Sequence, residues 1–243
     1  MRKILLLLLI FFSIQAKSQV LIALLFGDKL NQPGIEFGLE GGFNWSTMSG
    51  LETDSYLRSW NLGFYFDFKM KNQWHLYTGV LVKAKKGIGN LSKGDLSVLN
   101  ASLHTSINGS PIEGDYNQTL NYFLVPALAR YYFKHNIYAE LGPQFGLLHR
   151  GWIEFNSDIK GMDATVKEYN GELINKFDMG LMGGIGYKTL GGTGWSYGVK
   201  YYYGFIDVYK DIPKTKNSSI FIKVNIPIGI GDKEKAEEDL STF

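Results

Sequence analysis

The sequence predicts an all-β fold, an eight-stranded antiparallel up-and-down transmembrane β-barrel, on three observations. Apolar and polar residues alternate along segments of about ten residues or more, which suits strands that cross a membrane (~9–11 residues) better than ordinary strands of ~5–6. The connections between these segments alternate between short and long. The charged residues lie opposite the bulky apolar side chains, whereas a soluble lipocalin-like barrel would keep its apolar face inside.

Residues 1–18 are predicted to be a secretory signal peptide. Two basic residues precede an apolar run over residues 4–14, and the small residues Ala16 and Ser18 suit a signal-peptidase site. The run is shorter than the ~20 residues that a membrane-spanning helix needs. Residues 19–34 are expected to form an N-terminal periplasmic segment, either a short helix at the barrel mouth or a partner-binding segment. An extended signal region is the alternative.

The barrel is assigned to residues 35–230, and its strongest signal is the hairpin from Trp60 to Lys85. Apolar and polar residues alternate from Trp60 to Met70, a polar turn follows, and the alternation resumes from Trp74. The eight predicted strands cover residues 35–45, 60–70, 74–85, 120–133, 137–150, 177–187, 195–209 and 220–230.

The lengths of the connections predict the orientation. Short turns follow the second, fourth and sixth strands, and the longest connections are residues 87–117 and 151–175. Outer-membrane barrels have short periplasmic turns and long outer loops. An even number of strands then places both termini in the periplasm, with residues 231–243 as a charged periplasmic tail.

Strand parity divides the side chains into a lipid face and a lumen. Eight strands enclose a space about wide enough to be filled by side chains, so we expect a buried ion-pair network that closes the lumen. A narrow ion path or a small-ligand site is the alternative. The predicted lipid face includes Phe64, Phe66, Val80, Val82, Ile222, Val224 and Ile226. The predicted lumen network is Glu36, Glu40, Asp67, Lys69, Lys83, Arg130, Glu140, Lys176, Asp178, Lys200 and Lys223.

Composition and motifs argue against several functions. The chain has no cysteine, which removes thiol catalysis and thiolate metal sites, and its formal net charge of +2 gives no reason to expect nucleic acid as a partner. No phosphate-binding loop, zinc motif or nucleophile elbow is present. His104 and His149 have Ser102, Ser106, Glu154 and Asp158 nearby in sequence, but such residues are common in solvated loops. We therefore predict no catalytic residues, no metal and no cofactor.

Two stretches resemble a known family. The opening strand from Gly38 to Ser46 is glycine-spaced, and the pattern from Tyr122 to Pro126 leads into Arg130-Tyr131-Tyr132-Phe133. With the predicted signal peptide, these features resemble the PorT-like outer-membrane β-barrel family of Bacteroidota. The resemblance implies an outer-membrane barrel, and the family's namesake is linked to type IX secretion. Family barrels usually end at an aromatic residue of the last strand, whereas this chain continues into the charged tail.

Two hypotheses for the function follow. The first is a non-enzymatic structural or interaction protein, including an accessory subunit of an outer-membrane secretion or assembly complex. The alternative is an enzyme that acts on lipid, or a narrow channel for small solutes. The expected partners are outer-membrane lipid and a larger outer-membrane protein complex. Glycines 183, 184, 198 and 204 either allow close approach of another membrane protein or relieve crowding and strand curvature.

Overall fold

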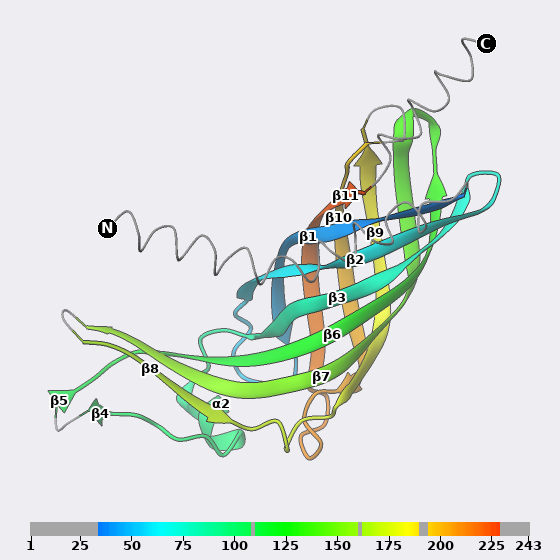
Figure 1. Ribbon diagram of the computed structural model, residues 1–243. Helices are drawn as coiled ribbons and strands as arrows, with labels where there is room; N and C mark the ends of the chain where they lie inside the picture. The colour runs from blue at the N-terminus through cyan, green and yellow to red at the C-terminus, as the bar shows by residue number, and fades with distance from the viewer. Residues whose placement is uncertain (1–33, 108–109, 160–161, 190–193, 229–243) are drawn as a thin grey trace, which may run out of the picture.

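The computed structural model describes residues 34–107, 110–159, 162–189 and 194–228 (Figure 1). The predicted signal peptide, the charged tail and all of the predicted N-terminal segment except Gly34 lie outside the described residues. Among the described residues, no helix is long and apolar enough to cross a membrane.

Eight antiparallel strands close into a barrel, which confirms the predicted fold class. Each strand pairs with the next in the chain, and the first pairs with the last, so the described strands close the sheet on itself. The strands are β1 (Ile35–Met48), β2 (Leu57–Lys71), β3 (Trp74–Ile88), β6 (Asp115–Tyr132), β7 (Ile137–Ile159), β9 (Phe177–Lys188), β10 (Ser196–Asp207) and β11 (Lys216–Pro227).

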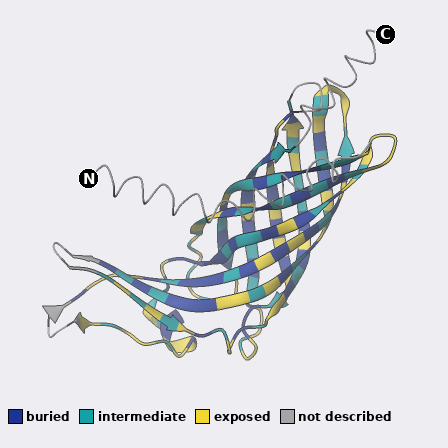
Figure 2. Cartoon of the chain, in the orientation of Figure 1, coloured by how far each residue is buried: buried dark blue, intermediate teal, exposed yellow. Residues whose placement is uncertain are grey.

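Side-chain burial alternates along the strands, as the period of two requires. In β11, Ile220 and Ile222 are exposed on the outside while Phe221 and Lys223 are completely buried inside. Figure 2 shows the same alternation as bands of exposed and buried residues around the barrel. The exposed apolar residues thus lie on the outside of the barrel, and the interior holds most of the buried polar groups.

The two longest predicted loops contain regular secondary structure. The connection after β3 contains α2 (Lys93–Val98) and the short strands β4 (Ser106–Ile107) and β5 (Ser110–Pro111). Strands β6 and β7 continue beyond the barrel, and β8 (Met162–Tyr169) pairs with the end of β7. We call β8 and the outer parts of β6 and β7 the extension; its β7–β8 hairpin projects away from the barrel in Figure 1.

The segment that contains α2 closes the long-loop end of the barrel with an apolar core. Leu96 and Leu99 of this segment are buried in the same cluster as Met48, Ile88 and Ile153 from the strands. Burial of these apolar side chains stabilises the segment against the rim. The long-loop end is therefore a folded cap rather than a set of independent loops.

A capping box fixes the start of α2. The Ser92 hydroxyl accepts a hydrogen bond from Asp95 N, and the Asp95 carboxylate accepts one from Ser92 N. Glu52 N, in the β1–β2 connection, also donates to Asp95 at 2.7 Å, as does Thr53 N at 3.2 Å. Burial alone would raise the pKa of the Asp95 carboxyl, but these hydrogen bonds outweigh it and hold the pKa below its usual range.

We predict that Ile222→Lys prevents normal insertion into bilayers. A lysine on the lipid face costs ~2–4 kcal/mol at the bilayer midplane, whereas Val98→Lys on the exposed face of α2 should change the free energy of unfolding little. Folding into lipid vesicles, followed by heat-modified mobility in gel electrophoresis, measures the difference. Equal folding of the two variants would show that this face does not meet lipid.

Acidification should loosen the attachment of α2 before the barrel unfolds. The pKa of Asp95 is lower in the folded protein than in the unfolded chain, so its stabilising contribution is complete above the ordinary aspartate range and disappears as the pH falls toward the folded value. Hydrogen exchange of residues 92–99 at falling pH measures this loss. Asp95→Asn should cost about 1 kcal/mol and remove the pH dependence; an unchanged pH profile in that variant would contradict the assignment.

Candidate functional site in the barrel interior

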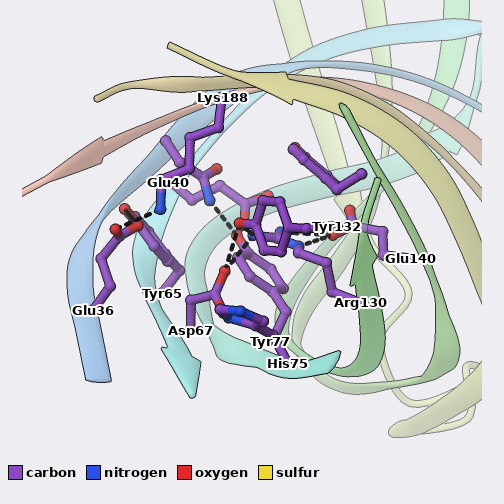
Figure 3. Close-up of polar contacts among 12 residues, drawn as sticks. Glu36, Glu40, Tyr65, Asp67, His75, Tyr77, Arg130, Tyr132, Glu140 and Lys188 are labelled. Carbon is purple, nitrogen blue, oxygen red and sulfur yellow. Dashed lines mark hydrogen bonds and ion pairs between the residues drawn. The ribbon is translucent and has the colours of Figure 1, made fainter. Parts of the chain in front are cut away.

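Charged side chains gather inside the barrel near its short-turn end, the rim formed by the β2–β3, β6–β7 and β9–β10 turns. Each sits at an inward position of its strand, so strand pairing brings them together. We call this set the interior charge cluster, most of which is labelled in Figure 3. Its members are Glu36, Glu40, Asp67, His75, Arg130, Glu140, Lys188, Lys200 and Lys223, with Tyr65, Tyr77, Tyr132 and Tyr138 between them.

Arg130 is the centre of the cluster. Its Nη1 donates to Asp67 Oδ2 at 2.7 Å, and its Nε and Nη2 both donate to Glu140 Oε2, at 2.9 and 2.6 Å. The guanidinium also lies over the rings of Tyr77 and Tyr138, 3.9 and 4.3 Å from their centroids. The planar fork of arginine suits simultaneous contact with two carboxylates. Arg130 therefore links strands β2, β6 and β7.

Two lysines extend the cluster toward β10 and β11. Lys223 Nζ donates to the other Glu140 oxygen at 2.7 Å, and Lys200 Nζ donates to Glu40 Oε1 at 2.6 Å. The Tyr77 hydroxyl donates to the second oxygen of Glu40. All of these side chains are almost completely buried. The two ion pairs link β11 to β7 and β10 to β1 across the interior.

A second group of contacts lies nearer the short-turn rim. Lys188 Nζ donates to Glu36 Oε2 at 2.6 Å, and Tyr65 OH donates to Glu36 Oε1 at 2.8 Å. Asp67 Oδ1 is 2.6 Å from His75 Nδ1. Figure 3 shows these side chains pointing toward one another from β1, β2, β3 and β9. They extend the cluster to the end of the barrel.

The cluster is electrically balanced. Within the described residues, four carboxylates meet four cations of arginine and lysine, and His75 adds a charge only when protonated. Buried ion pairs add little net stability over apolar packing, but an unpartnered buried charge is expensive. The arrangement can hold the strands in one register and fill the interior. Each of its described cations already has a carboxylate partner, so the cluster is poorly suited to bind a further ion.

A smaller polar group fills the middle of the barrel. Lys86 Nζ donates to Asp178 Oδ2 at 3.1 Å and lies 3.6 Å from the centroid of the Tyr202 ring. Asn217 Nδ2 donates to the same aspartate oxygen at 3.1 Å. Lys86 and Asp178 are both buried, so the sequence-predicted Asp178 has a partner that was not predicted.

The interior near the long-loop end is closed by uncharged groups. Tyr209 OH donates to Gln118 Oε1 at 2.5 Å, and Asn170 Nδ2 donates to the same oxygen at 2.8 Å. Ile174 and Leu120 are completely buried in the same part of the chain. The barrel is therefore filled by a charged layer, a polar layer and a mixed closing layer.

Three of the predicted lumen residues lie elsewhere. The prediction that Lys83 points into the lumen is wrong. This lysine lies on the outside, with Nζ 3.4 Å from the centroid of the Trp60 ring. The pairing of β3 shifts between Leu81 and Ala84, and this β-bulge turns Lys83 outward and Lys86 inward. The prediction that Lys69 and Lys176 belong to the lumen network is also wrong. Both are exposed near strand ends and form no ion pair with a described carboxylate.

The predicted lipid-face residues are partly or well exposed. Val80 and Ile222 are exposed, and Phe64, Phe66, Val224 and Ile226 are half-buried at positions between inward residues. Val82 is the extra residue of the β3 bulge, where Leu62 pairs with Lys83 and Gly63 with Leu81. The assignment of this face to lipid stays a prediction.

Glycines on β9 and β10 make room for the cluster. A Cβ at Gly186 would lie 2.2 Å from the Tyr138 ring, and one at Gly198 would lie 2.8 Å from the Tyr138 hydroxyl. Gly184 faces Lys200 and Gly204 faces Asp178 in the same way. Of the four glycines considered for a lipid-facing interface, Gly184, Gly198 and Gly204 instead relieve crowding inside the barrel. Gly183 lies against the exposed side chain of Leu141.

The candidate catalytic residues are not all brought together: Ser102 and His104 line one small pocket, which His149, Ser106, Glu154 and Asp158 do not line. His104 lies against the rings of Tyr116 and Phe155 in the extension, whereas His149 lies against Phe123 on the outside of the barrel. No described serine hydroxyl is hydrogen-bonded to either histidine side chain. The described residues also contain no group of three or more His, Asp or Glu side chains arranged to hold a metal ion.

The comparisons with known proteins decide the family. A profile described as "Outer membrane protein beta-barrel domain" matches residues 28–210. The chain belongs to this outer-membrane β-barrel family. Membership places the protein in the outer membrane and agrees with the closed antiparallel barrel. No curated protein has significant sequence similarity to the chain.

Several solved barrels are similar in fold. The match to Ail, the attachment invasion locus protein of Yersinia pestis, has 13% identity and a TM-score of 0.39 and covers 79% of this chain and 98% of that chain. The match to Neisserial surface protein A has 11% identity and a TM-score of 0.39, and it covers 79% of this chain and 96% of that chain. The match to the outer membrane protein OprG from Pseudomonas aeruginosa has 12% identity and a TM-score of 0.35, and it covers 80% of this chain and 93% of that chain.

We predict that Arg130→Met destabilises the barrel by ~3–5 kcal/mol, because Asp67 and Glu140 would lose the cation between them. Lys83→Met is the matched control. That lysine lies over Trp60 on the outside, and its loss should cost only ~0.5–1 kcal/mol. Urea-induced unfolding from lipid vesicles gives both values. Similar costs for the two variants would contradict the central role of Arg130.

Proposed function

We propose that the protein is a non-enzymatic outer-membrane interaction protein that uses its extension to bind a protein partner. The observation that carries this proposal is the contrast between the two parts of the molecule. The interior is filled by the balanced cluster and the layers above it, which leaves little room for solute or substrate. The extension, in contrast, is an ordered structure beyond the barrel rim.

The extension has the properties of a rigid recognition element. Tyr116, Phe155 and Val166 face one another across β6, β7 and β8, and Tyr116 and Phe155 are buried with ring centroids 4.8 Å apart. Mobile loops lose conformational entropy when they bind, but a preformed sheet loses less. Strand β8 is the last strand of the sheet, so its outer edge offers backbone groups to an extended segment of a partner.

The proposal includes the orientation of the barrel in the outer membrane and its relation to PorT-like barrels. We place the short turns and both termini in the periplasm and the extension outside, since outer-membrane barrels have short periplasmic turns. The resemblance to PorT-like barrels supports an accessory role in an outer-membrane secretion or assembly complex. In that role the barrel anchors the protein in lipid, and the extension contacts the larger complex.

A narrow path for water or small ions is the second candidate. The side-chain amides of Asn61 and Gln144 are buried and have no hydrogen-bond partner among the described residues. Buried amides usually have partners, so water molecules along the polar middle of the barrel would satisfy them. A continuous path would still have to pass the ion pairs of the interior charge cluster.

A pull-down from outer membranes tests the proposal. The tagged protein should retain a stoichiometric partner in mild detergent, whereas a trimmed variant that joins Phe155 to Val166 by a short turn should lose it. A variant with the Lys134–Asn136 turn replaced by another short turn is the control, because that turn lies at the opposite rim. Recovery of a lone barrel, together with measurable conductance in planar bilayers, would favour the channel.

A further inference from the structure

A notch opens in the wall of the barrel where β7 changes its partner. Strand β7 pairs with β9 as far as Leu147 and Phe177, and with β8 from Trp152 and Tyr169. The segment between β8 and β9 crosses this gap, with the buried Ile174 against Gly151, and forms two backbone hydrogen bonds with β7. At one end Leu148 N donates to Lys176 O, and at the other Asn170 N donates to Gly151 O. Between them lies a cavity of about 490 Å³.

Two cations are among the residues that line this notch. Arg150 and Lys176 line the cavity, both are exposed, and neither forms an ion pair with a described carboxylate. Every charged lysine or arginine of the interior cluster, in contrast, has an acidic partner. Cations without an acidic partner favour a phosphate ligand.

The notch also contains acceptors for hydroxyl groups. Glu168 and Glu172 line the same cavity. One Glu168 oxygen accepts a hydrogen bond from Ser102 N at 3.0 Å, and its remaining lone pairs are available. Tyr169, which is 66% exposed, also lines the cavity. Carboxylates, an exposed aromatic ring and two cations together suit a sugar that carries a phosphate group.

The notch opens beside exposed apolar residues on the outside of the barrel. Leu147, Leu173 and Phe177 are 56%, 44% and 48% exposed and lie beside it in the chain or in its lining. In a membrane barrel, this junction between apolar belt and polar rim lies at the level of lipid headgroups. A headgroup in the notch would place its acyl chains on these apolar residues. This position favours a lipid over a free sugar phosphate.

We propose that the notch binds the phosphorylated sugar headgroup of a membrane lipid. Arg150 and Lys176 contact the phosphate, and Glu168 and Glu172 accept hydrogen bonds from sugar hydroxyls. The apolar residues at the mouth contact the acyl chains. The site includes Glu168 and Tyr169 at the base of β8 but not the tip of the extension, so a variant that joins Phe155 to Val166 keeps its lining residues.

The test uses the full protein in phosphatidylcholine nanodiscs, with lipid A as the probe and bound lipid measured by native mass spectrometry. The double variant Arg150→Gln with Lys176→Gln should bind lipid A at least about tenfold more weakly, because it loses two charge-assisted contacts. The control is Lys71→Gln with Lys134→Gln, which removes the same charge from exposed positions at the opposite rim and should bind as the wild type does.

A variant with a side chain that fills the notch, and two ligands without acyl chains, complete the test. Leu173→Trp should fill the notch without changing its charge and should also weaken lipid binding, so the proposal does not depend on the folding of the double variant. Inorganic phosphate and glucosamine phosphate, tested as free ligands, should bind far more weakly than lipid A. Equal binding of lipid A by all the variants would overturn the site, and equal affinity for glucosamine phosphate would overturn its assignment to a lipid.

Discussion

The need to neutralise charge inside a closed barrel determines much of this structure. Arg130 meets Asp67 from β2 and Glu140 from β7, and these contacts form only in one strand register. A shift of one residue would turn a strand's charges toward lipid and its apolar residues inward. The interior ion pairs and the apolar outer face therefore specify the same alignment. This coupling explains how an interior so rich in charge remains compatible with a single fold.

The interior changes in character from one end of the barrel to the other. Near the short turns it is held by ion pairs such as Lys188 with Glu36, whereas near the long loops it is closed by the uncharged group of Gln118, Asn170 and Tyr209. The apolar core under α2 continues from this closing layer. The folded cap thus rests on the barrel interior, and the extension inherits its rigidity from the strands that form the wall.

Alternation in the sequence was sufficient to predict eight strands and most of the interior charges, because burial on one face imposes a period of two. It did not predict the bulge in β3. Lysines occur at both parities in Lys83-Ala84-Lys85-Lys86, so the sequence alone does not show which of them turns inward. The continuation of β7 into the extension was also missed. There Gly151, Trp152 and Ile153 are all buried. The α2 segment packs in one cluster with Ile153, and the side chains of Tyr169, Lys85 and Lys167 lie against the Trp152 ring.

The extension and the notch are consequences of the same change in pairing. A closed barrel leaves no strand edge unpaired, but β7 can leave the barrel only by exchanging β9 for β8. Around His149 and Arg150 the strand has neither neighbour on that side among the described residues, and its backbone groups need another partner. A barrel that extends one hairpin beyond its rim must therefore open its wall at the level where that hairpin begins. In this protein the opening lies beside exposed apolar residues and unpaired cations, which makes it suited to hold a ligand from the surrounding membrane.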